Sequence, residues 1–342
     1  MKITELLANK TILFFSVQTF NLEKEIIKKL ESLQAKVFYY DERPSNSNFT
    51  KGIIRLKRSV YQKKIDKYYQ TILDHTSDLH FDYLFVNRGE VVPAFFLEKF
   101  KLTHPNTIFI FYTWDSFTNH NHPTTILQYF DRKFTFDSDD AQKFNIGFRP
   151  LFFLDSYHKM GAKSNDIIYD LLFLGTAHSD RYTISNKIKE WCYSKQLKAY
   201  CYYYMQGKLV YFYKKNFDKT FKTFDYKKLS FESLNTNQIN DLYKKSNVIL
   251  DINHPGQKGL TMRTFEALGM EKKMITTNSE IKKYNFYNPN NILVIDRNNI
   301  LLDTNFFKNK YHPIDENLYK KTSMEGWLQS VFIDGEHENW MK

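Results

Sequence analysis

Cysteine is scarce in this 342-residue chain, which contains only Cys192 and Cys201. Two cysteines cannot build a disulfide framework, and we expect both to be small core residues in a reducing compartment. The amino-terminal run MKITELLANKTILFFSV is interrupted by Glu5, Asn9 and Lys10, so it does not match a secretory signal. No stretch approaches the roughly 18 to 20 apolar residues of a membrane-spanning helix. These absences predict a cytoplasmic protein, either soluble or peripheral on the inner face of the plasma membrane.

Acidic residues are also few relative to basic ones: the chain has 38 Asp and Glu but 49 Lys and Arg, and its net charge is +11. A basic surplus favours a polyanionic partner: nucleic acid, an anionic membrane or a phosphorylated small molecule. The sequence has neither a zinc-finger spacing nor an aromatic RNA-binding signature. We therefore expect no nucleic-acid partner, and membrane surfaces and nucleotide ligands become the better candidates.

Short apolar runs alternate with amphipathic helical stretches, which predicts parallel sheets covered by helices. In the first half the expected strands are 11–17, 35–42, 83–89, 107–115 and 133–138, with helices over 22–34 and 93–102. The pattern then restarts with strands at 167–176, 198–205, 247–253, 273–278 and 291–296, and with helices over 179–196, 237–246 and 261–268. We expect an α/β fold of two Rossmann-like domains, 1–157 and 158–312. A helix over 315–332, in a segment spanning 313–342, should pack back on the first domain.

Ligands of open α/β sheets bind at the carboxyl ends of the strands. The stretch GLTMRTFEALG (259–269) opens a helix at such a position. Gly259 permits close backbone approach, and Thr261 is a suitable N-cap. The helix N-terminus and Arg263 suit a phosphate, while the Glu266 carboxylate suits ribose hydroxyls. The alternative is an ordinary helix in which Arg263 and Glu266 form a surface ion pair.

The loop GTAHSDR (175–181) follows the first strand of the second domain. Gly175 and the backbone amides of Ser179 and Asp180 could approach a diphosphate, and His178 and Arg181 could neutralise it. In the alternative, Asp180 and Arg181 only cap and pair on the helix surface.

Two carboxylates end strands of the first domain: Glu90 follows YLFVNRG and Asp115 follows IFIFYTW. Either could serve as a general base or as a contact to a ligand. Asp115 is slightly preferred as the base, because Trp114 would desolvate the carboxylate and could stack on a sugar ring. The alternative for Asp115, which Ser116 follows, is a cap on the next helix.

The stretch DINHPGQKGLTMRTFEALGMEKKMITTN resembles the donor-binding region of GT-B glycosyltransferases, and more specifically of bacterial lipopolysaccharide and capsular polysaccharide biosynthesis glycosyltransferases. The resemblance extends to FDYLFVNRGEVVP, FYTWDS, FDRKFTFDSDDAQKF and YDLLFLGTAHSDR, and so to most of residues 80–300. It implies two Rossmann-like domains facing across a cleft. The first would bind the acceptor and the second the nucleotide sugar.

The resemblance also suggests the stereochemistry. Many retaining members of the family carry Glu-x7-Glu, and Glu266 matches the second position while Lys258 occupies the first. An inverting reaction is therefore slightly favoured. Lys258 could meet an acidic donor sugar or point into solvent.

One acidic motif is set aside. DSDD (137–140) contains the Asp-x-Asp that holds a metal in another glycosyltransferase fold, but here it opens a helix, where acidic side chains favour the dipole. We expect a helix cap, no metal and no cofactor, with a UDP-sugar as the favoured donor substrate.

Two basic, aromatic stretches, 51–70 and 200–228, suit an anionic membrane surface, as a lipid-linked saccharide acceptor would require. The alternative is a solvated helix face with a packed apolar stripe.

Together these features predict metal-independent transfer of a sugar from a nucleotide-sugar donor to a surface glycan: lipopolysaccharide, capsule or exopolysaccharide. The alternative is a non-catalytic glycan-binding or scaffold protein on a degenerate fold. Lys258 favours that alternative mildly, and the intact Arg263 and Glu266 oppose it. A nucleic-acid binder, suggested only by charge, comes third.

Overall fold

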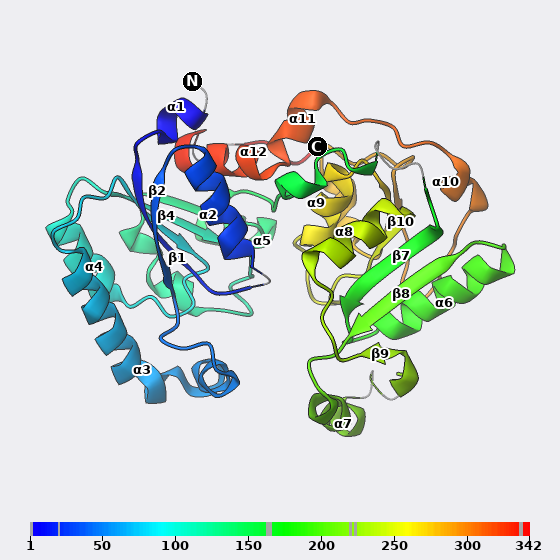
Figure 1. Cartoon of the computed structure of the whole chain (residues 1–342), viewed down its shortest axis with the longest axis horizontal. Helices are drawn as coiled ribbons and strands as arrows, with labels where there is room; N and C mark the ends of the chain where they lie inside the picture. The colour runs from blue at the N-terminus through cyan, green and yellow to red at the C-terminus, as the bar shows by residue number, and fades with distance from the viewer. Residues whose placement is uncertain (1–2, 20, 162–165, 219–220, 222–223, 335–337) are drawn as a thin grey trace. The chain divides into compact units, whose positions relative to one another are not determined.

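The computed structural model describes residues 3–19, 21–161, 166–218, 221, 224–334 and 338–342. The chain forms two compact units, shown in Figure 1. The first consists of Met1–Leu151 with Met324–Asn339, and the second of Phe152–Ser323 with Trp340–Lys342. Each unit is built on one six-stranded parallel sheet. The expected α/β class with two Rossmann-like units is confirmed.

The sheet of the first unit has the strand order β2-β1-β3-β4-β5-β6. Its strands are β1 Thr11–Ser16, β2 Lys36–Asp41, β3 Tyr83–Asn87, β4 Ile108–Thr113, β5 Arg132–Thr135 and β6 Gly147–Phe148. The helices between them are α1 Ile3–Leu7, α2 Leu22–Ser32, α3 Asn48–Thr76, α4 Ala94–Thr103 and α5 Ser138–Phe144. The order changes direction between β1 and β3, and such a switch point is where open α/β sheets bind ligands.

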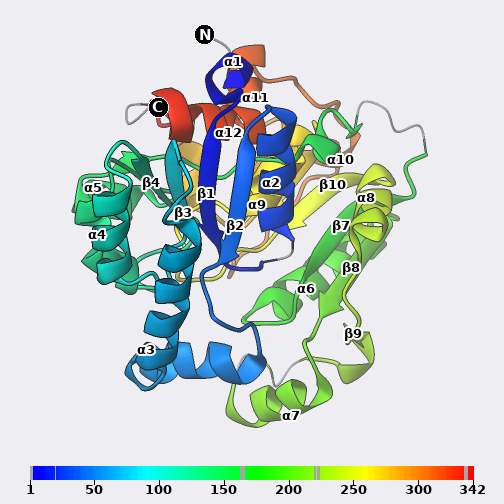
Figure 2. The same ribbon diagram turned by 60° about the vertical axis from the view of Figure 1, so that its left-hand side comes forward.

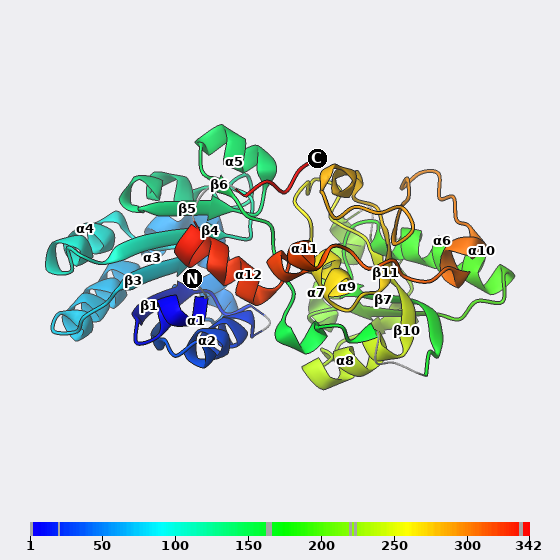
Figure 3. The same cartoon turned by 90° about the horizontal axis from the view of Figure 1, so that it is seen from above.

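Successive side chains of a strand point to opposite faces of the sheet, so the apolar strands make both faces apolar. Helices cover both of these faces. On one face Phe15 of β1 packs on Tyr69 of α3, with ring centroids 5.7 Å apart. On the other, Phe14 stacks on Phe85 at 5.1 Å, and Phe85 lies 5.8 Å from Trp327 of α12 (Met324–Gln329). Figure 3 shows α12 along the sheet of the first unit. The predicted return of the C-terminal segment to this unit is confirmed.

The prediction of one helix over 315–332 is wrong in detail. The structure has α11 (Glu316–Lys321), then α12, and then a π-helical turn at Ser330–Asp334. The helix is interrupted where the chain leaves the second unit: the Thr322 hydroxyl donates to the Tyr319 carbonyl at 2.7 Å, and the Thr322 carbonyl accepts from the Phe153 amide at 2.9 Å. The final residues then rejoin the second unit, where the Asn285 amide donates to the Trp340 carbonyl at 3.1 Å.

The sheet of the second unit has the order β12-β11-β10-β7-β8-β9. Its strands are β7 Tyr169–Thr176, β8 Ala199–Tyr204, β9 Leu229–Ser230, β10 Ser246–Asp251, β11 Lys273–Thr276 and β12 Ile292–Val294. Its helices are α6 Arg181–Ser194, α7 Lys208–Phe217, α8 Thr236–Lys244, α9 Met262–Gly269, α10 Thr304–Lys308 and α11. Read from β9 to β12, this is the strand order of dinucleotide-binding Rossmann folds, with the switch point between β7 and β10.

Two predictions made from the composition concern the cysteines and membrane-spanning helices. Cys192 is buried, Cys201 is half-buried, and both are free thiols. None of the helices in the described residues is long and apolar enough to cross a membrane. The cysteines therefore pack as small residues of the second unit.

Candidate functional site

The loops after β7 and β10 adjoin the switch point of the second sheet, where β7 and β10 pair directly through Leu172 and Ile249. The first loop leads into α6, which begins at Arg181. The second leads into α9, which begins at Met262. All the predicted donor-binding residues lie on β7, on these two loops, at the start of α6 or on α9. Parallel strands end at a common edge, so one ligand can touch both loops.

Arg181 joins the two loops. Its Nε donates to the Ile252 carbonyl at 2.9 Å, and its Nη1 donates to the Thr176 hydroxyl at 3.2 Å. Burial, followed by the charge of Arg263, lowers the pKa of Arg181 to about 10. The alternative in which Arg181 pairs with Asp180 on the helix surface is not what the structure has.

Arg297, just after β12, is a site residue that the sequence analysis missed. Its Nη1 donates to both carboxylate oxygens of Asp180, at 2.8 and 2.7 Å. Its Nη2 donates to the carbonyl and side-chain oxygens of Asn253, both at 2.6 Å. Arg297 thus ties the loops after β7, β10 and β12 together, and it brings a third guanidinium close to Arg181, whose pKa its charge also lowers.

Arg263 and Glu266 on α9 are joined by Tyr243 of α8. The Tyr243 hydroxyl donates to Glu266 Oε2 at 2.6 Å and accepts from Arg263 Nε at 3.4 Å. Both charged side chains are half-buried, whereas Tyr243 is buried. Burial raises the pKa of Glu266, against the opposing effects of Arg263 and of the Tyr243 hydrogen bond. The arrangement is therefore a bridged triad and not the simple surface pair of the alternative interpretation.

Thr261 occupies the N-cap position of α9 but does not cap it with its side chain. Its hydroxyl instead donates to Asp251 Oδ2 at 3.0 Å, so the expectation of a side-chain cap is wrong. The buried Asp251 competes for the hydroxyl because its carboxylate needs a donor. Just before, Gly259 is buried and Lys258 is exposed, and the backbone carbonyl of Lys258 accepts from Asn278 Nδ2 at 3.0 Å.

His178 is half-buried in the loop after β7, with Nδ1 3.0 Å from the Ser179 hydroxyl. Burial, then the charges of Arg181 and Lys214, lower the pKa of His178 to about 3. The imidazole is consequently neutral near pH 7, with one ring nitrogen a donor and the other an acceptor. Gly175 lies inside β7, where a Cβ would come within 2.7 Å of the ring of Phe173.

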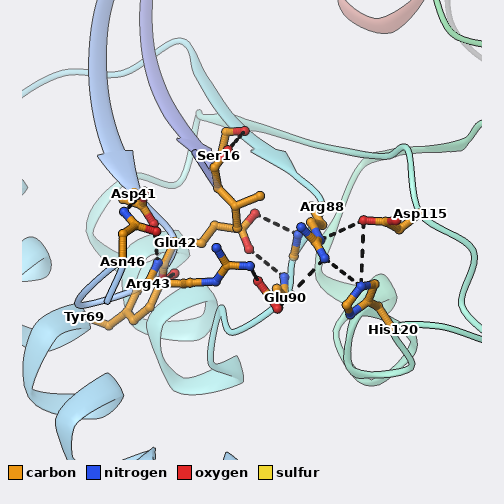
Figure 4. A network of polar contacts seen from close by, with 12 residues as sticks. Ser16, Asp41, Glu42, Arg43, Asn46, Tyr69, Arg88, Glu90, Asp115 and His120 are labelled. Carbon is orange, nitrogen blue, oxygen red and sulfur yellow. Dashed lines mark hydrogen bonds and ion pairs between the residues drawn. The ribbon is translucent and has the colours of Figure 1, made fainter. Parts of the chain in front are cut away.

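The first unit carries a second polar network at the ends of its strands, drawn in Figure 4. Glu90 is buried after β3 and forms an ion pair with Arg43. Asp115 is half-buried after β4, and its Oδ2 lies 2.9 Å from Arg88 Nε. Asp115 therefore pairs with an arginine, and no helix follows it that it could cap. Figure 4 places both predicted carboxylates in one network.

Glu42, which follows β2, was missed by the sequence analysis. It is fully buried, and its two oxygens accept from the backbone amides of Gly89 at 2.8 Å and Glu90 at 2.6 Å. Burial raises the pKa of Glu42 to about 8. The loop that it holds is strained at Arg88, which has a φ of 103°, whereas Gly89 adopts its φ of 70° without a Cβ clash. Glu42 therefore fixes the backbone between Arg88 and Glu90.

His120 belongs to this network, and Asn87 directly precedes Arg88 in the chain. Asn87 is fully buried, and neither atom of its side-chain amide has a partner among the residues that the structure describes. His120 Nε2 lies 2.6 Å from Arg88 Nη2 and 3.9 Å from Asp115 Oδ2. Carboxylate, guanidinium, imidazole and amide groups together provide donors and acceptors for a ligand rich in hydroxyl groups.

The DSDD motif is a helix cap, as expected. Asp137 accepts from the backbone amides of Asp139 at 3.0 Å and Asp140 at 3.3 Å at the start of α5. Asp140 in turn accepts from the Phe117 amide at 2.8 Å. Across the described parts of the chain, no group of three or more His, Cys, Asp or Glu is arranged to hold a metal ion.

The two basic stretches differ from one another. Residues 51–70 lie on α3, where Ile65 and Tyr69 are buried in the core; the side chains of 51, 53 and 55–57 lie outside what the structure describes. Residues 200–228 include α7, and residues 219–220 and 222–223 of this stretch are not described. The packed apolar stripe of the alternative interpretation is present on α3.

Comparison with known proteins gives a likeness of fold. No family model and no curated protein matches the chain. Among solved structures, it is similar to the N-terminal domain of Candida albicans trehalose-6-phosphate phosphatase, with 7% identity, a TM-score of 0.54 and coverage of 94% of this chain and 95% of that one. It is also similar to Methanocaldococcus jannaschii UDP-GlcNAc 2-epimerase in complex with UDP-GlcNAc and UDP (12% identity, TM-score 0.46, coverage 84% and 89%) and to a spinosyn rhamnosyltransferase (8%, 0.39, 78% and 80%). At these identities the likeness concerns architecture alone: with its two Rossmann-like sheets, the chain has a GT-B-like α/β fold.

Proposed function

We propose that the protein is a glycosyltransferase whose second unit binds a nucleotide-sugar donor. The observation that carries the proposal is the group of Arg181, Arg263 and Arg297 at the switch point, beside a carboxylate, Glu266, that Tyr243 holds in place. Clustered guanidinium groups suit a diphosphate, and an oriented carboxylate suits the two hydroxyls of a ribose.

In this mechanism the arginines act on the leaving group. Negative charge develops on the donor diphosphate as its bond to the sugar breaks, and fixed guanidinium groups stabilise that charge best in the transition state. Burial lowers the pKa of Arg181 most, the charges of Arg263 and Arg297 lower it further, and a bound anion would relieve the repulsion among these charges. The same residues leave no need for a metal ion on the diphosphate, in keeping with metal-independent transfer.

The first unit would bind the acceptor saccharide through the network around Arg88. Asp115 is the best candidate for the base, because its carboxylate is half-buried while Glu42 and Glu90 are buried. It would take the proton from an acceptor hydroxyl while that oxygen bonds to the anomeric carbon and the diphosphate departs, with inversion. Arg88 fixes the orientation of the carboxylate at 2.9 Å.

The acceptor we propose is a growing surface glycan, and a UDP-sugar is the donor to test first. The resemblance of residues 253–278 to lipopolysaccharide and capsule glycosyltransferases supports this choice. A lipid-linked acceptor would bring the enzyme to the inner membrane surface.

The first test is thermal unfolding with UDP, GDP, CMP or dTDP, on the wild type, on Glu266→Ala and on the control Glu190→Ala, whose exposed carboxylate lies on α6. A nucleotide at about 100 times its dissociation constant should stabilise the folded state by about 2.7 kcal/mol. We expect one nucleotide to raise the melting temperature of the wild type and the control, but not of Glu266→Ala. If no nucleotide stabilises any of the three proteins, the non-catalytic alternative replaces this proposal.

The second test analyses products. The nucleotide sugar chosen by the first test is incubated with the enzyme, and the release of nucleoside diphosphate is followed together with the NMR spectrum of the sugar. Release with slow hydrolysis or transfer supports a glycosyltransferase. A changed sugar that stays attached to its nucleotide would contradict transfer and indicate epimerisation.

A further inference from the structure

Helix α7 presents an apolar face to solvent. Leu209, Phe212, Tyr213 and Phe217 are 86, 55, 66 and 74% exposed. Their spacing of three, four and eight residues from Leu209 places them along one side of the helix. Single exposed apolar residues are common on protein surfaces, but four large ones on one face of a short helix mark an interaction site.

The opposite side of α7 holds the helix to the second unit. Tyr211 is buried, with ring centroids 5.9 Å from Phe221 and 5.0 Å from Tyr226. Lys215 Nζ donates to the Tyr211 hydroxyl at 2.9 Å. Figures 1 and 2 both show α7 beside β9. The exposed apolar residues are therefore the outer face of a helix that is anchored from behind.

The sequence around this helix is basic. Residues 208–228 contain seven lysines and two aspartates, and lysines both open α7 and lie in its last turn. Exposed aromatic and aliphatic side chains flanked by lysines are the composition of helices that lie in the interface of an anionic bilayer. We choose an anionic lipid surface as the occupant because it matches both the positive charge and the exposed apolar side chains.

The other basic stretch does not offer such a face. On α3 the apolar residues Ile54, Ile65 and Tyr69 are buried in the core of the first unit. Val60 is the large apolar residue that remains exposed among the described side chains of this stretch. The lysines of α3 thus surround a helix whose apolar stripe is already used for folding.

We propose that α7 docks the protein on an anionic lipid surface. Leu209, Phe212 and Phe217 enter the boundary between headgroups and acyl chains, and the flanking lysines bind headgroup phosphates. The proposal deepens the proposed function by naming the surface at which the acceptor would be met.

The test uses the full-length protein and sucrose-loaded vesicles, made either of phosphatidylcholine alone or of equal parts of phosphatidylcholine and phosphatidylglycerol. Wild type should sediment with the anionic vesicles, less at high salt, and not with the neutral ones. Phe212→Ser/Phe217→Ser should weaken the partitioning at least about tenfold. Its thermal unfolding should match the wild type, because both replaced side chains are exposed.

A matched charge variant on α3, Lys63→Gln/Lys64→Gln/Lys67→Gln, replaces three exposed lysines and should retain most of the vesicle binding. The proposal is overturned if wild type ignores anionic vesicles, or if the α7 variant binds them equally well. It is also overturned if light scattering shows a dimer that the α7 variant dissociates while vesicle binding stays unchanged, because the face would then join two copies of the chain. Glu266→Ala should bind vesicles like wild type, so a failed donor site and a failed docking face give different results.

Discussion

Replacing Tyr243 with phenylalanine tests whether Glu266 is held in place for a ligand. The variant keeps the ring, which meets Tyr157 edge-on at 5.7 Å, and removes only the hydroxyl that lies 2.6 Å from the carboxylate. A hydrogen bond to a charged group contributes about 1.5–3 kcal/mol. The free energy of unfolding of the second unit should fall by that amount.

The effect on ligand binding should be separate from this loss of stability. Without the hydroxyl, Glu266 can turn away from the position that faces the ribose. We expect the dissociation constant of the matching nucleotide to rise about tenfold, which is a loss of about 1.4 kcal/mol of binding free energy. It should be measured by isothermal titration calorimetry at a temperature at which the variant is fully folded.

Tyr203→Phe is the matched control. Tyr203 is also buried in the second unit, and its hydroxyl lies 2.7 Å from the neutral hydroxyl of Ser185. Its loss should cost about 1 kcal/mol of stability and leave nucleotide affinity unchanged. If Tyr243→Phe lowers the melting temperature but binds nucleotide like the control, then Tyr243 is a purely structural residue and our account of Glu266 is refuted.

Three further predictions concern charges. Arg297→Lys keeps the positive charge but loses the fork in which Nη1 donates to Asp180 and Nη2 donates to Asn253, so calorimetry should show nucleotide binding weakened about tenfold; unchanged binding would remove Arg297 from the site. The pKa of His178 is about 3 in the folded protein, so on acidification the unfolded chain binds a proton at this histidine before the folded protein does. The free energy of unfolding should therefore fall as the pH drops below about 6.5, by about 1 kcal/mol at pH 5.5. Urea unfolding at pH 7.5 and 5.5 should show a smaller loss in His178→Asn, and equal losses would contradict this. The Glu42 carboxyl, with a pKa of about 8, keeps its proton longer when folded, so its contribution to stability declines as pH rises from 4.5 to 8. In Glu42→Gln this decline should vanish in the same titration, at a cost of about 1–3 kcal/mol because an amide NH2 faces the Gly89 or Glu90 amide; a persisting decline would point to another group.

The strands and the donor loops could be predicted because their signals are local. Alternating apolar runs located every long strand of both sheets to within a few residues, although the two-residue strands β6 and β9 have no such run. The rule that ligands meet the ends of strands directed attention to His178 and Arg181. Applied more fully, the same rule would have included Arg297, which directly follows the expected strand 291–296, and Glu42, which is the last residue of the expected strand 35–42.

Other features depend on contacts between distant residues. Tyr243 lies in the last turns of a helix and is 23 positions from Glu266, so nothing near it in the sequence indicates its hydrogen bond. Threonine is a common N-cap residue, and only the folded structure shows that the Thr261 hydroxyl donates to Asp251 instead. The break between α11 and α12 depends on the hydrogen bond from the Phe153 amide to the Thr322 carbonyl, and Phe153 lies at the other end of the second unit's sequence.

The late position of α12 in the chain has a consequence for synthesis on the ribosome. Phe85 and Tyr112 of the first sheet are covered by Trp327, with ring centroids 5.8 and 4.9 Å away. At about 5–20 residues per second, Trp327 leaves the ribosome about 10–40 s after Tyr112. During that interval the nascent first unit has an uncovered aromatic face on its central strands. Chaperone capture and cotranslational aggregation should therefore both centre on this face, and a stalled or truncated chain should be cleared as a misfolded one.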